Sequence, residues 1–154
     1  MPDDTPCEIS SEVAGGVPQP ISQQEIPHQR ISHHLLLCAT PAKALCCPDP
    51  AVGAASWDTL KRLVRELGLE DPARPKGIVL RSKADCLRIC VEGPVLLIWP
   101  EGCVYGGITP ERIERILQEH ILQGRPIHDW LVRQYELSRM SPPTQPPPPT
   151  QPFD

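Results

Sequence analysis

Two groups of cysteines, each following a short apolar run, are the feature of this sequence that most restricts what the chain can fold into. Cys86 and Cys90 form a C-x3-C pair, while Cys38 ends an earlier apolar run and is followed by the doublet Cys46 and Cys47. If the apolar runs are neighbours in one sheet, the sulfurs converge at one edge of that sheet, where α/β proteins usually place their chemistry. The sequence therefore predicts a thiol-lined site at a sheet edge.

The meaning of seven cysteines in 154 residues depends on the cellular compartment. In a secreted domain they would form a disulfide framework with one thiol left over. The N-terminal residues Met1 to Asp4 are acidic, whereas a secretory signal needs basic residues followed by an apolar core. Since no stretch approaches the ~20 apolar residues of a membrane span, we expect a soluble, cytoplasmic protein without membrane insertion. In that compartment clustered thiols are metal ligands or redox-active groups.

The uneven distribution of proline divides the chain into three parts. Residues 1–31 mix Pro, Ser, Gln, Glu and Gly without a hydrophobic period, which predicts a disordered leader. Residues 138–154 contain a repeated Pro-Pro-Thr-Gln-Pro motif and are predicted to be a Pro-rich disordered tail. The remaining residues, 32–137, are enough for one hydrophobic core, so we expect a single domain.

The charge of the chain gives little information about partners. The formal net charge is −4, and acidic and basic residues are interspersed without a block of Lys or Arg. A protein that binds the phosphate backbone needs clustered positive charge. We therefore expect no nucleic-acid partner.

The first half of the domain has the pattern of a strand, a helix and a second strand. Residues 35–38 predict a buried strand, although leucine is not β-branched and the pattern does not exclude a helical turn. Prolines and a glycine predict a long loop over 39–55, and Ser56 is the expected N-cap of a helix that Gly68 ends. The run 77–82 predicts the next strand. This order predicts parallel strands joined by a right-handed crossover.

The second half of the domain has the pattern of a hairpin followed by a helix. The apolar run 95–99, the turn at Glu101 and Gly102, and the short run 103–105 predict two antiparallel strands. Thr109 is the expected N-cap of a helix with an apolar stripe. The two halves together predict an α/β fold with a small mixed sheet flanked by helices.

The spacing of the thiols favours an iron-sulfur cluster over a zinc ion. Seven residues separate Cys38 from Cys46 and eight separate it from Cys47, whereas zinc knuckles use a C-x(2 to 4)-C spacing. A two-iron cluster, with two thiolates on each iron, fits a wide loop better. A structural or regulatory zinc-binding module is the alternative. A thiol-disulfide enzyme is less favoured because no C-x-x-C stands at a helix start.

The residues after the C-x3-C pair carry a resemblance to a known family. They form the run C-x3-C-x2-Gly-Pro-x5-Pro-x-Gly, which starts at Cys86 and includes Gly93-Pro94 and the hairpin turn. With Cys38 and the cysteine doublet, this pattern resembles the thioredoxin-like [2Fe-2S] ferredoxins over residues 33–132. The chain looks similar to Shethna-type proteins and to the ferredoxin-like subunit of respiratory complex I, with the strongest likeness to cyanobacterial members.

The resemblance implies a thioredoxin-like fold, a [2Fe-2S] cluster, and one-electron transfer between redox partner proteins rather than an enzymatic activity. It also implies a cis peptide bond between Gly93 and Pro94. The sequence leaves open whether the chain forms a homodimer. The cofactor-binding metal ligands that the resemblance implies are Cys38, Cys46, Cys86 and Cys90, with Cys47 as the alternative to Cys46.

Other polar residues have more ordinary interpretations. Cys7 and Cys103 are expected to be buried or idle thiols, since a single cysteine is usually a small apolar residue. Neighbouring side chains on a strand point to opposite faces, so His33 and His34 are interpreted as a surface pair. Arg88 is either a solvated charge or a residue that tunes the cluster from outside its ligands.

Overall fold

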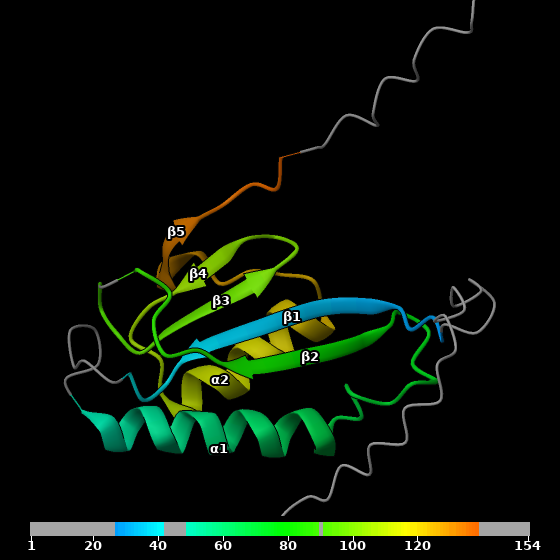
Figure 1. Ribbon diagram of the computed structural model, residues 1–154, viewed down its shortest axis with the longest axis horizontal. Helices are drawn as coiled ribbons and strands as arrows, with labels where there is room; N and C mark the ends of the chain where they lie inside the picture. The colour runs from blue at the N-terminus through cyan, green and yellow to red at the C-terminus, as the bar shows by residue number, and fades with distance from the viewer. Residues whose placement is uncertain (1–26, 42–48, 90, 139–154) are drawn as a thin grey trace, which may run out of the picture.

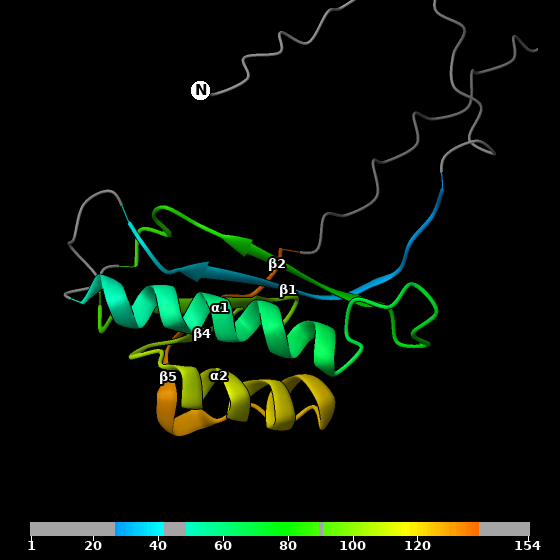
Figure 2. The same cartoon turned by 90° about the horizontal axis from the view of Figure 1, so that it is seen from below.

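The computed structural model describes residues 27–41, 49–89 and 91–138, which form one mixed sheet with two helices (Figure 1). Both helices cover the same face of the sheet (Figure 2). The strands are β1 (Ile31–Cys38), β2 (Ile78–Lys83), β3 (Val95–Trp99), β4 (Cys103–Tyr105) and β5 (Leu131–Gln134). The helices are α1 (Pro50–Glu66) and α2 (Pro110–Ile116), with a π-helical continuation at Leu117–Leu122 and a 3-10 turn at His128–Trp130. The leader before residue 27, the tail after residue 138 and Cys7 lie outside the described residues.

The strand order in the sheet is β2-β1-β3-β4-β5. β1 and β2 are parallel and are connected through α1, which confirms the predicted strand, helix and strand unit. β3 is antiparallel to β1 and to β4, so the predicted hairpin is also confirmed. The segment after the last helix pairs with β4 as the edge strand β5. Because β1 and β2 are parallel, the chain leaves both strands at the same edge.

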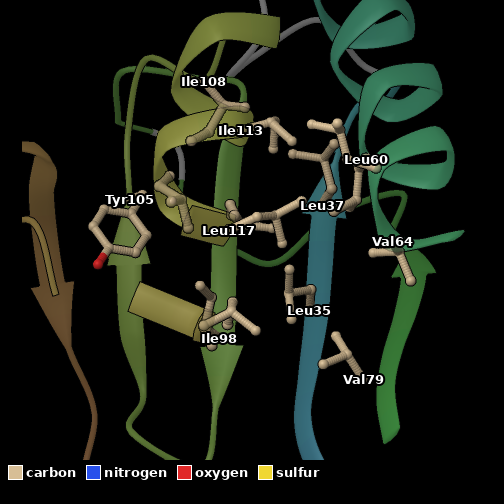
Figure 3. Packing of buried hydrophobic residues seen from close by; sticks show 14 of the residues in the cluster. Leu35, Leu37, Leu60, Val64, Val79, Ile98, Tyr105, Ile108, Ile113 and Leu117 are labelled. Carbon is tan, nitrogen blue, oxygen red and sulfur yellow. The ribbon is translucent and has the colours of Figure 1, made fainter. Parts of the chain in front are cut away.

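The main core lies between the sheet and the two helices. Leu35 and Leu37 of β1 point toward Leu60 of α1 and Ile113 of α2, and all four side chains are fully buried (Figure 3). Alternate residues of a strand face one side, which explains why Leu35 and Leu37 share this core. The core fixes α1 and α2 against the strands that end at the predicted thiol site.

A smaller apolar cluster lies on the other face of the sheet. Val95 and Leu97 of β3 and Val104 of β4 contribute to it. Ile89, from the loop after β2, also packs there and is only 4% exposed. Since this loop carries the C-x3-C pair, the burial of Ile89 anchors the candidate site to the sheet.

The start of α1 differs from the sequence prediction. Asp49, not Ser56, is the N-cap, and its carboxylate accepts a hydrogen bond from Ala51 N at 2.9 Å. Ser56 is buried inside the helix, where its hydroxyl donates to Val52 O at 2.7 Å. Pro50 is compatible with the first helical position because the N–H that proline lacks has no partner there. The predicted loop is therefore shorter than residues 39–55.

Gly53 explains how the first turn of α1 fits against the end of β1. A Cβ atom at this position would lie 1.8 Å from the carbonyl oxygen of Ala39, so only glycine allows this approach. Ala39 directly follows Cys38. The glycine that indicated a loop in the sequence therefore serves a close contact beside a predicted ligand.

Replacing Gly53 by alanine is expected to destabilise the fold by about 1 to 3 kcal/mol, because α1 must move away from Ala39. Helix propensity alone predicts the opposite sign, since alanine favours a helix interior by about 1 kcal/mol over glycine. Urea unfolding measures the change. Ala55→Gly is the control: it lies at an exposed position of the same helix, so it measures the effect of helix propensity alone, without a contact to Ala39. An unchanged or stabilised Gly53→Ala variant contradicts the contact.

Both histidines of the pair are half-buried and hydrogen-bonded, whereas the sequence predicted a surface pair. The side chain of His33 is 15% exposed, and its Nε2 lies 3.1 Å from Glu101 Oε1. Nε2 of His34 lies 2.9 Å from the Ser82 hydroxyl on β2. His33 shares the face of Leu35 in β1, so it points toward the helices rather than to solvent.

His33 belongs to a buried polar cluster at the edge of the sheet away from Cys38. The ring of His120, which is 1% exposed, lies 6.1 Å from the ring of His33, and its Nδ1 forms a hydrogen bond of 2.9 Å with Tyr105 OH. The same hydroxyl accepts from Ile127 N at 3.1 Å. Burial raises the pKa of Tyr105 to about 12, so the phenol stays protonated. His120 follows the spacing of the apolar stripe that includes Ile116, a signal that the sequence prediction did not use.

Replacing Tyr105 by phenylalanine is expected to destabilise the fold by about 1 to 3 kcal/mol, because a buried ring nitrogen and the N–H of Ile127 lose their partner. Urea unfolding at neutral pH tests this value. Tyr135→Phe is the matched control, since its hydroxyl only accepts from exposed Arg133, and its effect should stay within about 0.5 kcal/mol. Equal effects of the two substitutions contradict a buried hydrogen-bond role for Tyr105.

Candidate metal centre

The ends of β1 and β2 bring two predicted ligands to one edge of the sheet. Cys38 is the last residue of β1, and β2 continues into the loop that carries Cys86. Ala84 N donates to Leu37 O at 2.9 Å, so the two chain segments stay together beyond the strands. The sulfur of Cys38 lies 3.3 Å from Asp85 O, the carbonyl next to Cys86. Parallel strand ends therefore place Cys38 beside the start of the C-x3-C segment.

The two cysteines differ in exposure. Cys38 is 1% exposed, whereas Cys86 is exposed. The sulfur of Cys86 accepts a hydrogen bond from the backbone N–H of Arg88, with an N to S distance of 3.3 Å. The thiolate is the form of cysteine that binds metals. The edge thus offers one buried sulfur and one surface sulfur that already has a donor.

The loop after β2 has an unusual backbone. Arg88 and Glu92 have positive φ angles of 57° and 48°, which residues other than glycine rarely adopt. Glu92 O accepts a hydrogen bond from Gly107 N, so the loop is attached to the segment after β4. The peptide bond between Gly93 and Pro94 is cis, as the resemblance implies, and a second cis bond precedes Pro100. The hydrogen bond from Gly107 N therefore attaches the loop to the body of the fold just after the C-x3-C pair.

The other predicted ligands, Cys46, Cys47 and Cys90, lie outside the described residues. Within the described ranges, His, Cys, Asp and Glu residues form no group of three or more that could hold a metal ion. The chain segments next to the doublet and to Cys90 nevertheless meet. Asp49 at the start of α1 and Gly93 line one hollow of about 190 Å³. Residues close in sequence to the doublet and to Cys90 therefore line the same hollow, while the ligands themselves stay predictions.

Cys103 lies elsewhere in the fold. It is 1% exposed and pairs with Ile98 of β3, whereas Cys38 pairs with Val95. Three residues along a strand span about 10 Å, so Cys103 is at the opposite end of β3 from the candidate centre. Burial, followed by the nearby Glu101 carboxylate, raises the pKa of the Cys103 thiol. It has the surroundings of a buried, protonated thiol.

Sequence comparisons relate the chain to small iron-sulfur proteins, although no family model matches it. A protein named "Ferredoxin, 2Fe-2S" from Clostridium pasteurianum is 26% identical over 97 residues, which cover 60% of this chain and 87% of that protein. A protein of the same name from Aquifex aeolicus (strain VF5) is 36% identical over 42 residues, covering 27% of this chain and 38% of that protein.

Comparison with solved structures identifies the fold. A thioredoxin-like [2Fe-2S] ferredoxin from Aquifex aeolicus superposes with a TM-score of 0.56 and 18% sequence identity, covering 73% of this chain and 100% of that chain. Its Cys55Ser variant gives a TM-score of 0.54, with 66% and 99% coverage. The predicted thioredoxin-like α/β fold is confirmed. Together with the names of the sequence relatives, these comparisons support the thioredoxin-like [2Fe-2S] ferredoxin family, while the Shethna-type and cyanobacterial subgroups stay predictions.

No helix in the described ranges is both long enough and apolar enough to cross a membrane. The longest, α1, carries the charged residues Lys61, Arg62 and Arg65 on its C-terminal half.

Proposed function

We propose that this protein is a one-electron carrier that binds a [2Fe-2S] cluster and passes electrons between redox partner proteins. One observation carries the proposal: the parallel ends of β1 and β2 place the sulfur of Cys38 3.3 Å from the backbone beside Cys86. Thiolates are the preferred ligands of iron-sulfur clusters. The names of the similar proteins support the same cofactor. The proposed carrier domain is residues 32–137.

The proposed ligands are two cysteines from the end of β1 and the loop that follows it, and two from the loop after β2. They are Cys38, Cys46, Cys86 and Cys90, with Cys47 as the alternative to Cys46. When bound, the cluster supplies a centre that accepts and returns one electron. The Cys38 thiol donates toward Asp85 O, so its proton must leave when the sulfur becomes a ligand. We place this chemistry in the cytoplasm, where such thiols stay reduced.

The exposed side of the site is the proposed entry point for electrons. Cys86 is exposed, and Val91, next to Cys90, is an apolar residue with 48% exposure. Cys38, in contrast, is buried. A partner that docks over Cys86 and Val91 therefore approaches the cluster from the side with the least protein in between.

Anaerobic purification of the full chain, followed by metal analysis and spectroscopy, tests the proposal. We expect iron and acid-labile sulfide in equal amounts, visible absorption that bleaches on reduction, and an electron paramagnetic resonance signal of the reduced protein. A colourless protein that contains zinc and no iron refutes the proposal and favours a zinc-binding module.

A further inference from the structure

We propose that the backbone N–H of Arg88 tunes the candidate centre through its hydrogen bond to the Cys86 sulfur, and that the left-handed backbone of Arg88 holds this donor in place. The inference rests on the proposed function, because the property that is tuned is the reduction potential of the cluster that Cys86 is proposed to bind. Arg88 is thus a positioning residue, and its contribution comes from its main chain.

One backbone angle links the donor N–H to the buried residue that follows it. Arg88 N lies 3.3 Å from Cys86 Sγ, and the φ angle of Arg88 is 57°. This angle sets the rotation between the peptide plane that carries the N–H and the chain that continues to Ile89. While Ile89 stays buried, a different φ would turn that plane, and its N–H, away from Cys86. Most residues with a Cβ atom avoid this region, while Gly and Asn enter it more readily. The Arg88 side chain is exposed, so packing of the side chain does not account for the conformation.

Neighbouring contacts keep the loop in this conformation. Ile89, the next residue, is 4% exposed in the apolar cluster with Val95 and Leu97. Farther along, the left-handed Glu92 is attached through its carbonyl to Gly107 N. The N–H of Arg88 is therefore oriented before any cofactor binds.

A fixed donor to a ligand sulfur has a predictable electronic effect. Reduction adds one electron to the cluster, and part of the added negative charge resides on the sulfur ligands. A hydrogen bond to a ligand sulfur stabilises the reduced form more than the oxidised form and raises the reduction potential. Displacing the N–H of Arg88 must therefore lower the potential.

Four substitutions separate the backbone effect from the loss of charge. Arg88→Gly, Arg88→Asn, Arg88→Ala and Arg88→Val all remove the same positive charge. Gly and Asn accept the left-handed conformation, Ala accepts it less readily, and Val resists it most. We expect equal midpoint potentials for the Gly and Asn variants, a lower potential for Ala and the lowest for Val. Dithionite titration of the full-length, cluster-loaded protein, followed by visible absorption and electron paramagnetic resonance, measures these values.

If Arg88→Val fails to retain the cluster, a direct measurement of the hydrogen bond in the wild type still tests the inference. Wild-type protein labelled with 15N at the backbone nitrogen of arginine should show a weak 15N coupling to the reduced cluster in pulsed electron paramagnetic resonance. Arg88→Gly, prepared in the same labelled medium, should lose this coupling because its nitrogen at position 88 is unlabelled. A missing coupling in the wild type overturns the inference.

The outcomes for the site and for the tuning residue are distinct. Equal potentials in all four variants, with a normal cluster in the wild type, overturn the inference and leave the proposed function standing. A wild-type protein without iron and sulfide overturns the proposed function and the inference with it.

Discussion

Replacing Cys86 by alanine is expected to abolish the visible absorption and the electron paramagnetic resonance signal of the loaded protein. The substitution removes the exposed sulfur that already accepts the N–H of Arg88, so one iron loses a protein ligand. Cys38→Ala should have the same effect, because its sulfur lies beside the start of the same loop. Iron and sulfide content after anaerobic purification quantifies the loss, which we expect to be nearly complete.

Cys103→Ala is the matched control for these substitutions. Cys103 is buried at the far end of β3, so alanine should leave the spectrum unchanged. Serine is a poorer control, because it would place a hydroxyl group in the apolar core. Loss of colour in Cys103→Ala, or full colour in Cys86→Ala, contradicts the proposed ligand set. Separate alanine variants of Cys46 and Cys47 distinguish the second ligand, and we expect only Cys46→Ala to lose the cluster.

Local chemical signals in the sequence indicate the start of α2 and the residues at which the helical segments end. Thr109 caps α2 as expected, and its side chain accepts from Arg112 N at 3.2 Å. Gly68 and Gly124 end their helices with positive φ angles. These features depend on residues within one or two turns of each other, so a short stretch of sequence specifies them.

The start of α1 could not be predicted in the same way, because it depends on a contact between distant residues. Gly53 packs against the carbonyl of Ala39, and without this contact a proline followed by a glycine indicates a loop. The hydrogen bond from Arg88 N to the Cys86 sulfur could not be predicted from the sequence either. A positive φ at a residue other than glycine has no signature in the residue type itself. The cysteine spacing thus predicted where the centre lies, but not how its loop is held.

The buried histidines were missed for a different reason. Alternation along β1 places His33 on the face of Leu35, and helical spacing places His120 near Ile116 and Leu117. Both signals are present in the sequence. A surface interpretation of His33 failed because its partner Glu101 comes from the hairpin turn, 68 residues away. Polar residues on apolar faces indicate a buried cluster only when their distant partners are known.

The unfolding free energy is expected to fall as the pH drops below about 6.5, and His120 is the main cause. Burial lowers the pKa of His120 from its usual value of 6.5, and the nearby His33 lowers it further, while the Glu101 carboxylate opposes both. Tyr105 also faces the ring, and its hydroxyl lies 2.9 Å from Nδ1. In the unfolded chain the same imidazole takes up a proton near pH 6.5.

The sign of the effect follows from proton uptake. Between the folded and unfolded pKa values of His120, the unfolded state binds more protons, so the stability rises with pH and is lost as the pH falls through this window. Above about pH 7.5 the ring is neutral in both states and contributes no slope. One proton gives a slope of at most about 1.4 kcal/mol per pH unit.

Urea unfolding of wild type and His120→Gln between pH 5 and pH 8 tests this expectation, because glutamine keeps a polar side chain but does not titrate. We expect the loss of stability below about pH 6.5 to be smaller in His120→Gln than in the wild type. His128→Gln is the control, since His128 is exposed on the 3-10 turn and should keep the wild-type slope. Parallel curves for wild type and His120→Gln would show that the acid sensitivity arises from other groups. If only His120→Gln flattens the curve of unfolding free energy against pH, the acid sensitivity arises from the buried His120 ring, which joins the π-helical turn to Tyr105 of β4.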